Sequence, residues 1–326
     1  MKQAINMINV DETIVDPKIK ELIKHYDFNF VVDDLNKYKY HAVGIGDILN
    51  TFTYLKNDIM QGPIVFPIFM FFNTHYYPDP LNALNFILQL IYDLIKSNSF
   101  NMNQFLIVIP NNSKECLDQF LIKPPRRDWI NNCGNTYMPK YNIHVKSFTL
   151  DLVGIDRKYI PPQLLGKKYI VFNTKLRFID NFNYTELKQQ LSTFFKTYKT
   201  NYTIVLLGEK KFGNTKEGNW HKIQTMYNEL LELKKNNHVI DLTTESIIND
   251  LDYDLYIKDA SIMHYAEYSI CCGLGGHFCS SLAFAKNIIT FESTYETNLH
   301  NVKNLNSYKD FNDYLSKLKS IALPLP

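Results

Sequence analysis

Arginine is scarce in this chain, with only four among its 35 basic residues, namely Arg126, Arg127, Arg157 and Arg177. Basic residues nearly balance the 33 acidic ones, which leaves a formal net charge of +2. Such a small charge gives no electrostatic support for nucleic-acid binding or for a polybasic membrane arm, so neither is expected. Lysine far outnumbers arginine, and Asn, Ile, Tyr and Phe are abundant, as AT-rich codons produce. A retained arginine is therefore a candidate bidentate anion ligand, the alternative being a surface residue kept by chance.

Long apolar runs and paired cysteines are also missing. The longest nearly apolar run, residues 64–72, is far short of the roughly 20 residues of a spanning helix, so no transmembrane segment is expected. Residues 1–10 are mixed rather than basic and then apolar, so no signal peptide is expected either. The five cysteines are odd in number and include no C-x-x-C pair, which argues against a disulfide framework and a structural zinc site. A cytoplasmic location is the simplest expectation.

The pattern that is present alternates strands with helices. Apolar runs predict strands over 40–43, 64–72, 105–109, 169–172, 202–207, 239–242, 268–272 and 288–291. Helical spacing predicts helices over 48–55, 80–96, 184–198, 216–235, 245–254, 257–266, 277–285 and 308–321. This alternation is typical of an α/β fold with parallel sheets covered by helices on both faces.

The length of 326 residues predicts two domains, and Pro161-Pro162 marks a break between them. We expect a first domain over 1–160, a second over 161–305, and a C-terminal helix over 306–326 that packs back toward the first. In open α/β sheets, ligands bind at the carboxyl ends of strands where the strand order reverses. With two facing domains, the cleft between them is the expected site.

The strongest local motif is the turn Cys272-Gly273-Leu274-Gly275-Gly276-His277, between an apolar strand and a small-residue helix. Glycines let the backbone approach a ligand closely, and a helix N-terminus offers unpaired N–H groups to phosphate. The hydroxyls of Ser280 and Ser281 add donors. The motif therefore favours phosphate binding, the alternative being a turn that only reverses the chain.

Two further motifs follow strands. Thr174-Lys175-Leu176-Arg177 places two cations where they can bracket a diphosphate, the alternative being a solvated loop. Gly44-Ile45-Gly46-Asp47 precedes the helix over 48–55, where Asp47 is either a simple N-cap or a carboxylate facing the cleft.

Together these motifs resemble glycosyltransferases of the two-Rossmann (GT-B) type, nearest to the heptosyltransferase family. The pattern Gly46-Asp47-Ile48-Leu49 with Thr51 is similar to that family's first-domain turn. The loop Asn173-Thr174-Lys175, the strand end Leu206-Leu207-Gly208-Glu209 and the turn before residues 282–288 resemble its second domain. The family's acidic residue before the glycine turn is Cys272 here, and its proline before the last strand is Asn287.

The resemblance implies two Rossmann-like domains facing a cleft, the first on the acceptor side and the second binding the nucleotide sugar. It implies metal-independent sugar transfer, without a cofactor, from an ADP-, UDP- or GDP-sugar to a glycan or other hydroxyl acceptor. Asp47 is the expected catalytic base. The expected donor-binding residues are Thr174, Lys175, Arg177, Glu209, Gly275, Gly276, His277 and Ser280.

Two other functions stay open. A sugar-nucleotide epimerase of the same architecture needs extra carboxylates and a histidine, which His75 and Asp79 can supply. A catalytically silent nucleotide-sugar-binding protein is consistent with Cys272 in place of the acid. The segment Asp252-Tyr253-Asp254 matches the Asp-x-Asp metal-binding motif, but we expect it between two short helices, away from both glycine turns.

Overall fold

The protein is seen in a computed structural model, which describes residues 21–22, 24–26, 28–33, 45–58, 64–67, 80–110, 149–173, 202–208, 239–243, 252–272, 276–291 and 302–305. The chain divides into two compact units. The first comprises Met1–Lys140, Leu150–Val153 and Ile248–Tyr253, and the second Tyr141–Thr149, Gly154–Ile247 and Asp254–Pro326. Both contain parallel strands and helices, so the expected α/β class is confirmed. The sequence-derived ranges 1–160, 161–305 and 306–326 stay predictions.

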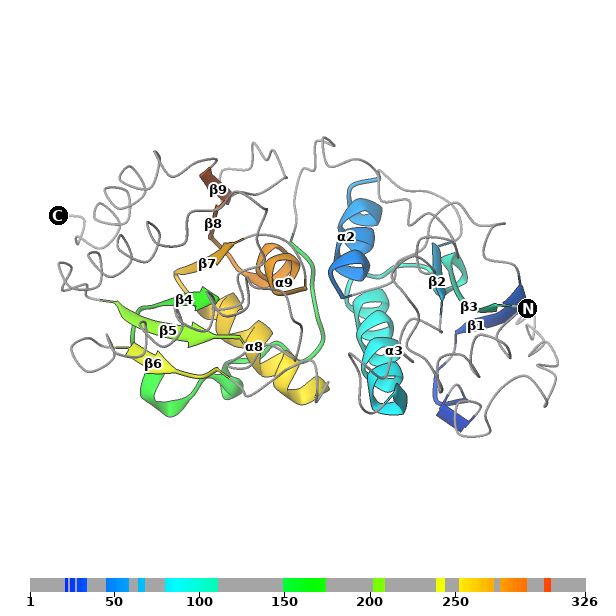
Figure 1. The fold of residues 1–326 in the computed structure, drawn as a ribbon, viewed down its shortest axis with the longest axis horizontal. Coiled ribbons are helices and arrows are strands. Elements are labelled where there is room, and N and C mark those ends of the chain that lie inside the picture. The colour runs from blue at the N-terminus through cyan, green and yellow to red at the C-terminus, as the bar shows by residue number, and fades with distance from the viewer. Residues whose placement is uncertain are drawn as a thin grey trace, which may run out of the picture. The chain divides into compact units, whose positions relative to one another are not determined.

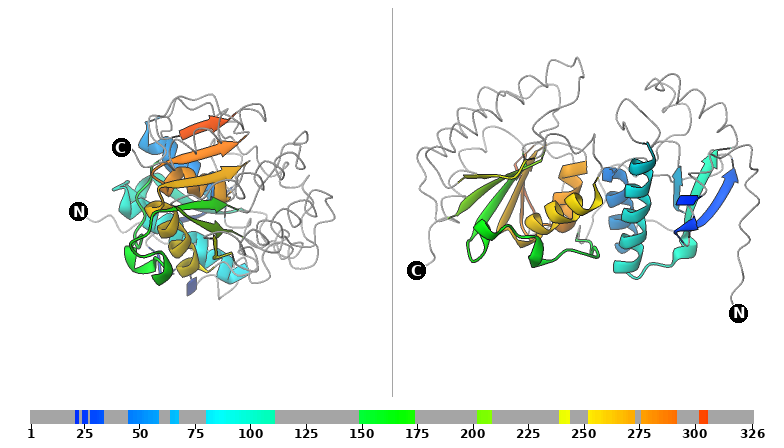
Figure 2. Two further views of the ribbon diagram at one scale, coloured as in Figure 1. Left: turned by 90° about the vertical axis from the view of Figure 1, so that its left-hand side faces the viewer. Right: turned by 90° about the horizontal axis from the view of Figure 1, so that it is seen from below.

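The first unit contains a three-stranded parallel sheet in the order β1-β3-β2. Its strands are β1 (Asn29–Asp33), β2 (Ile64–Pro67) and β3 (Phe105–Pro110). Two helices, α2 (Ile45–Lys56) and α3 (Pro80–Ser97), lie on one face of this sheet (Figures 1 and 2). A short 3-10 helix, η3 (Met102–Gln104), leads into β3.

Stacked aromatic rings fill the space between α2 and this sheet. The Phe52 ring of α2 lies 5.3 Å from that of Phe105 and 6.3 Å from that of Phe66, with both pairs nearly parallel. All three side chains are almost completely buried, as are Ile48 and Leu49 of α2. Burial of each such side chain contributes on the order of 1.5–3 kcal/mol to the stability of the fold. The apolar stripe that predicted this helix is therefore the face that packs on the sheet.

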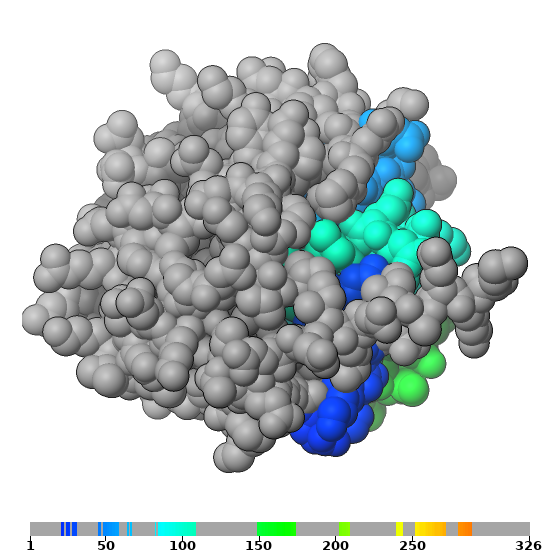
Figure 3. Space-filling model, turned by 90° about the vertical axis from the view of Figure 1, so that its right-hand side faces the viewer, coloured from blue at the N-terminus to red at the C-terminus, as the bar shows by residue number. Residues whose placement is uncertain are grey.

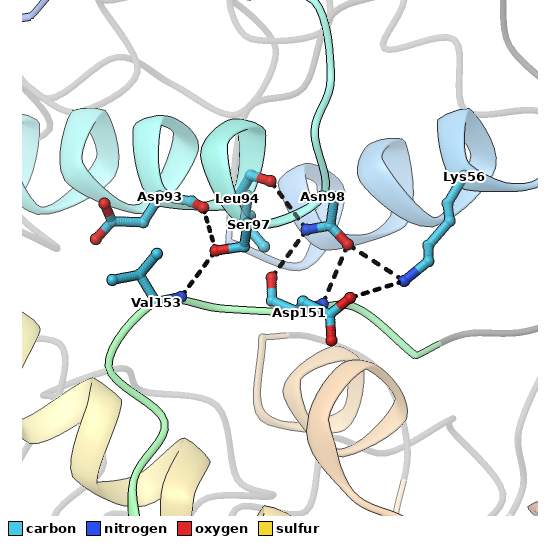
Figure 4. A network of polar contacts seen from close by, with 7 residues as sticks. All are labelled: Lys56, Asp93, Leu94, Ser97, Asn98, Asp151 and Val153. Atoms are coloured by element: carbon cyan, nitrogen blue, oxygen red, sulfur yellow. Dashed lines mark hydrogen bonds and ion pairs between the residues drawn. The ribbon is translucent and has the colours of Figure 1, made fainter.

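The segment 150–153 is tied to the ends of α2 and α3 by polar contacts (Figure 4). Asn98 donates from Nδ2 to the carbonyl of Asp151 at 2.8 Å and accepts at Oδ1 from the Asp151 N–H at 3.1 Å. Lys56 Nζ lies 3.3 Å from a carboxylate oxygen of Asp151. The Val153 N–H donates to Ser97 Oγ at 2.8 Å, and that hydroxyl donates to the Asp93 carbonyl at 2.6 Å.

Asp93 of α3 also anchors a second segment of the first unit. Its carboxylate accepts hydrogen bonds from Tyr253 Oη at 2.6 Å and from Gln89 Nε2 at 2.9 Å. One helical turn before Gln89, Asn85 of α3 accepts at Oδ1 a hydrogen bond from Tyr26 Oη at 2.8 Å. In Figure 3, part of the blue surface of the first described residues lies near the turquoise surface of the α3–β3 region. Burial, with a smaller contribution from Asp93, raises the pKa of Tyr26 to about 12.

The second unit contains a six-stranded, fully parallel sheet in the order β6-β5-β4-β7-β8-β9. Its strands are β4 (Tyr169–Asn173), β5 (Thr203–Leu207), β6 (Val239–Asp241), β7 (Tyr268–Cys272), β8 (Ile288–Phe291) and β9 (Val302–Leu305). Counted along the chain from β4, this is the order 3-2-1-4-5-6 of doubly wound nucleotide-binding sheets. Every residue of β4 and β5 is buried, as expected of central strands of a parallel sheet.

Helices α8 (Tyr253–Tyr265) and α9 (Gly276–Phe284) lie side by side on one face of this sheet (Figures 1 and 2). They are joined by His264 Nδ1 at 3.0 Å from the carbonyl of Phe284. The chain reaches β4 through two 3-10 helices, η4 (Arg157–Tyr159) and η5 (Pro162–Leu164). The Asp156 N–H donates to Ser261 Oγ of α8 at 3.2 Å, which holds this connection against the helix.

Several predicted elements need correction. The predicted helices over 245–254 and 257–266 are wrong in their boundaries, because α8 runs unbroken from Tyr253 to Tyr265. Strands β1 and β9 were not expected, and the expected strand over 40–43 lies outside the described residues, as do the helices over 184–198, 216–235 and 308–321. Among the described residues, no helix is both long and apolar enough to cross a membrane.

Candidate functional site

The candidate site is the carboxyl edge of the six-stranded sheet between β4 and β7. These strands are hydrogen-bonded neighbours, and β4 ends at Asn173 while β7 ends at Cys272. The chain runs outward from β4 through β5 to β6 on one side, and from β7 through β8 to β9 on the other. The order therefore reverses between β4 and β7, and ligands of doubly wound sheets bind in the crevice at such a point.

Helix α9 starts at this edge. Only residues 273–275 separate the end of β7 from Gly276, so the N-terminus of α9 lies at the carboxyl ends of the strands. The first N–H groups of a helix lack partners within it, and the helix dipole adds a partial positive charge there. The start of a helix at a topological switch point is a suitable place for an anionic group such as phosphate.

Asn173 lies at the centre of a buried polar cluster beneath this edge. Its side chain is fully buried, and Nδ2 donates to Ser281 Oγ of α9 at 2.9 Å and contacts Met263 Sδ of α8 at 3.8 Å. Ser269 Oγ of β7 donates to the same Ser281 hydroxyl at 3.1 Å. Asn173 thereby joins the end of β4 to the two helices and, through Ser281, to β7.

One atom of this cluster stands out. Among the side chains that the structure describes, Asn173 Oδ1 is the buried polar atom without a hydrogen-bond partner. A buried amide oxygen loses its hydrogen bonds to water on folding, and leaving it unpaired costs about 1–3 kcal/mol. Such orphaned acceptors are uncommon in folded proteins and call for a physical explanation.

The predicted donor-binding residues fall unevenly on the described part of the chain. Thr174, Lys175 and Arg177 follow β4 but lie outside the described residues, and so do Glu209 and Gly275. Their roles stay predictions.

Three donor-binding predictions fall on α9. Gly276 and His277 are its first two residues, at the predicted helix start, although the side chain of His277 is outside the described set. Ser280 is 2% exposed, and its hydroxyl lies 3.0 Å from Tyr256 Oη of α8. That hydroxyl therefore has a partner in α8, and a donor-binding role for Ser280 stays a prediction.

Asp47, the predicted base, lies in the first unit. Helix α2 begins at Ile45, so Asp47 is its third residue rather than the N-cap that precedes a helix at residue 48. Its side chain is outside the described set, so a catalytic role for Asp47 stays a prediction. Near a helix N-terminus, a carboxylate is stabilised by the helix dipole.

Two more carboxyl groups of the second unit have notable surroundings. At the end of β6, Asp241 Oδ1 accepts from both the N–H and the hydroxyl of Thr243, at 3.0 and 2.6 Å, which closes a local turn at the same edge of the sheet. Asp259 of α8 is 6% exposed. Burial raises the pKa of its carboxyl group to about 7, against a smaller opposing effect of Lys258.

No group of three or more His, Cys, Asp or Glu side chains within the described ranges is arranged to hold a metal ion. Asp254 lies in the first turn of α8, with Asp252 just before the helix. Asp252 therefore precedes the start of α8, and Asp254 lies within the helix.

Sequence reasoning missed Asn173 as a site residue, although it counted this residue within a family-like loop. The available signal was an amide at the end of a strand whose other residues, Tyr169 to Phe172, are apolar or aromatic. Buried polar side chains are costly unless paired, so a polar residue closing such a strand favours a specific role there.

Comparisons of this chain with protein-family models, with curated proteins and with solved structures find no match.

Proposed function

We propose that this protein is a glycosyltransferase that moves a sugar from a nucleotide sugar to a hydroxyl acceptor. The observation that carries the proposal is the strand order of the six-stranded sheet, which reverses between β4 and β7. The two sequence motifs with anion-binding character, Thr174–Arg177 and Gly273–His277, directly follow these two strands. In this proposal the two units are the two Rossmann-like domains of a GT-B enzyme, with the second unit binding the donor.

The donor diphosphate would be held at the N-terminus of α9 and by Lys175 and Arg177. An oxygen of the acceptor hydroxyl attacks the anomeric carbon, the bond from that carbon to the diphosphate oxygen breaks, and the nucleoside diphosphate leaves with the electron pair. Positive charge and oriented N–H groups stabilise the charge that develops on the leaving group. Asp47 takes the proton that the acceptor hydroxyl loses.

The test is incubation of the full chain with ADP-, UDP- and GDP-sugars, followed by chromatography of nucleotides and sugars. Slow release of nucleoside diphosphate, faster when a hydroxyl acceptor is added, is the expected result. An isomerised sugar nucleotide would identify an epimerase instead, and tight binding without turnover would identify a silent binding protein. Absence of binding to every nucleotide sugar would contradict all three functions.

A further inference from the structure

The unpaired oxygen of Asn173 belongs to the residue that ends β4 at the edge of the sheet where the donor is proposed to bind. Asn173 is the last residue of β4, and β4 borders the point at which the strand order reverses. Its Nδ2 faces the interior, toward Ser281 in the second turn of α9 and Met263 near the end of α8. The other polar atom of the same amide, Oδ1, has no partner among the described residues.

We propose that Asn173 Oδ1 accepts a hydrogen bond from a sugar hydroxyl of the bound nucleotide ligand. The inference rests on the function proposed above and adds a specificity-determining residue to it. It explains why an amide, and not an apolar side chain, ends a fully buried strand. An acceptor that is unpaired in the protein alone gains its full hydrogen-bond energy when a ligand supplies the donor.

The chemistry of the atom selects the ligand group. An amide oxygen accepts hydrogen bonds only, and phosphate oxygens at neutral pH are acceptors as well, so Asn173 Oδ1 repels phosphate. In the proposed donor the diphosphate lies at the N-terminus of α9, and a sugar ring flanks it on each side. These rings carry hydroxyl donors, whereas the base is separated from the diphosphate by the ribose. The partner of Asn173 is thus a hydroxyl of the ribose or of the transferred sugar.

The contacts around Asn173 favour a role in ligand selectivity over a role that only links β7 to α9. Ser281 already receives a hydrogen bond from Ser269, so the link between β7 and α9 does not depend on Asn173. Asn287, which precedes β8 at the opposite edge of the same sheet, donates from Nδ2 to the Glu267 carbonyl at 3.0 Å. It provides a matched control, because it is an asparagine of the same unit far from the candidate site.

The test is calorimetric titration of the full chain with ADP, UDP and GDP, with their 2′-deoxy forms and with the corresponding nucleotide sugars. Asn173→Leu removes the amide, and Asn287→Leu is the control. If the partner is a ribose hydroxyl, the Asn173→Leu variant binds nucleoside diphosphates roughly tenfold or more weakly than the parent. It should also bind the ribose and 2′-deoxy forms with equal affinity. If the partner is in the transferred sugar, only nucleotide-sugar affinity falls by that factor. Asn287→Leu leaves every affinity unchanged.

Asn173→Thr covers the case in which the leucine variant does not fold, because threonine keeps a polar hydroxyl in a residue that favours strands but lacks the amide oxygen. The same fall in affinity is expected. Unchanged binding of both nucleoside diphosphate and nucleotide sugar by a folded Asn173 variant would overturn this inference and leave the proposed function standing. If the parent chain binds no nucleotide at all, the proposed function and this inference fall together.

Discussion

Asn173 and Ser281 are 108 positions apart in the chain, and the amide of the first donates to the hydroxyl of the second at 2.9 Å. This bond connects the end of β4 with α9, the two elements that border the point where the sheet order reverses. The segments that sequence reasoning selected for anion binding are continuations of these same elements. The buried cluster therefore fixes the position of the end of β4 relative to α9, the two elements next to the motifs on which the proposed donor site depends.

Removing the Ser281 hydroxyl should destabilise the protein. Ser281→Ala leaves Asn173 Nδ2 and the Ser269 hydroxyl without their acceptor in a fully buried position, which costs about 1–3 kcal/mol. Urea unfolding measures the loss. Adding Asn173→Leu to Ser281→Ala should recover part of it, because the unpaired amide is then gone. Equal stability of Ser281→Ala and the parent would show that the cluster contributes nothing.

Asp259 should make stability depend on pH. Its folded-state pKa of about 7 lies above the ordinary value of 3.8, so between these values the unfolded chain loses a proton that the folded chain keeps. Stability from this group is therefore greatest at low pH and is lost as the pH rises toward 7. Asp259→Asn should become more stable than the parent as pH rises, by on the order of a few kcal/mol at pH 8. Denaturant unfolding at pH 5 and pH 8 checks this, and parallel pH profiles would contradict it.

Gly154 should tolerate alanine poorly. Its φ of +94° is a conformation that side chains disfavour, and an added Cβ would lie 3.2 Å from Cγ2 of Ile257. Gly166 also has a positive φ, +73°, but no atom lies within 4 Å of its added Cβ. Gly166→Ala should cost about 1–2 kcal/mol, and Gly154→Ala clearly more.

Ile257→Leu removes the crowding methyl group, so it should rescue Gly154→Ala in part. Thermal unfolding of the three variants provides the measurement. A Gly154→Ala protein at least as stable as Gly166→Ala would show that Ile257 does not crowd a side chain at position 154.

Asp47→Asn should separate a catalytic from a structural role. Asparagine keeps the size and polarity of Asp47 in the first turn of α2 but cannot take the proton. Sugar transfer should fall by roughly 10²-fold or more, the usual scale for losing general-base assistance. Melting should change little, because losing the charge near a helix N-terminus costs only about 0.3–1 kcal/mol. A folded Asp47→Asn protein with the parent's transfer rate would assign Asp47 a structural role.

Local patterns predicted the elements with strong apolar signals. Helix α3 was expected over 80–96 and ends one residue later, and β7 and β8 have the expected bounds. Strand β9, Val-Lys-Asn-Leu, pairs with β8 and ends the sheet among the described strands, and its two polar residues leave little apolar signal. The start of α8 was missed because Asp252, Asp254 and Lys258 interrupt an apolar stripe, and Asp259 is a carboxyl group in a buried position.

The site could be predicted only in part, because some of its contacts join residues far apart in the sequence. Turns after strands carry local signals, so the glycine turn at residues 273–276 and the cations after β4 were identified from sequence. The contact between Asn173 and Ser281 depends on how β4, β7 and α9 pack, and no short sequence window contains both residues. The sequence also could not reveal that Ser280 faces Tyr256 in the core while its neighbour Ser281 meets Asn173.

The central claim, that a nucleoside diphosphate binds beside the end of β4, is tested most directly by calorimetric titration of the parent, Arg177→Ala and Arg157→Ala with ADP, UDP and GDP. Arg157 is a matched control, since its guanidinium lies 5.2 Å from the Tyr265 ring, near the start of β7 at the opposite edge of the sheet. The account predicts that at least one diphosphate binds the parent. Arg177→Ala should then lose about 1.5–3 kcal/mol of binding energy, with Arg157→Ala unchanged. Absence of binding to the parent, or equal affinity of the parent and Arg177→Ala, would contradict the account.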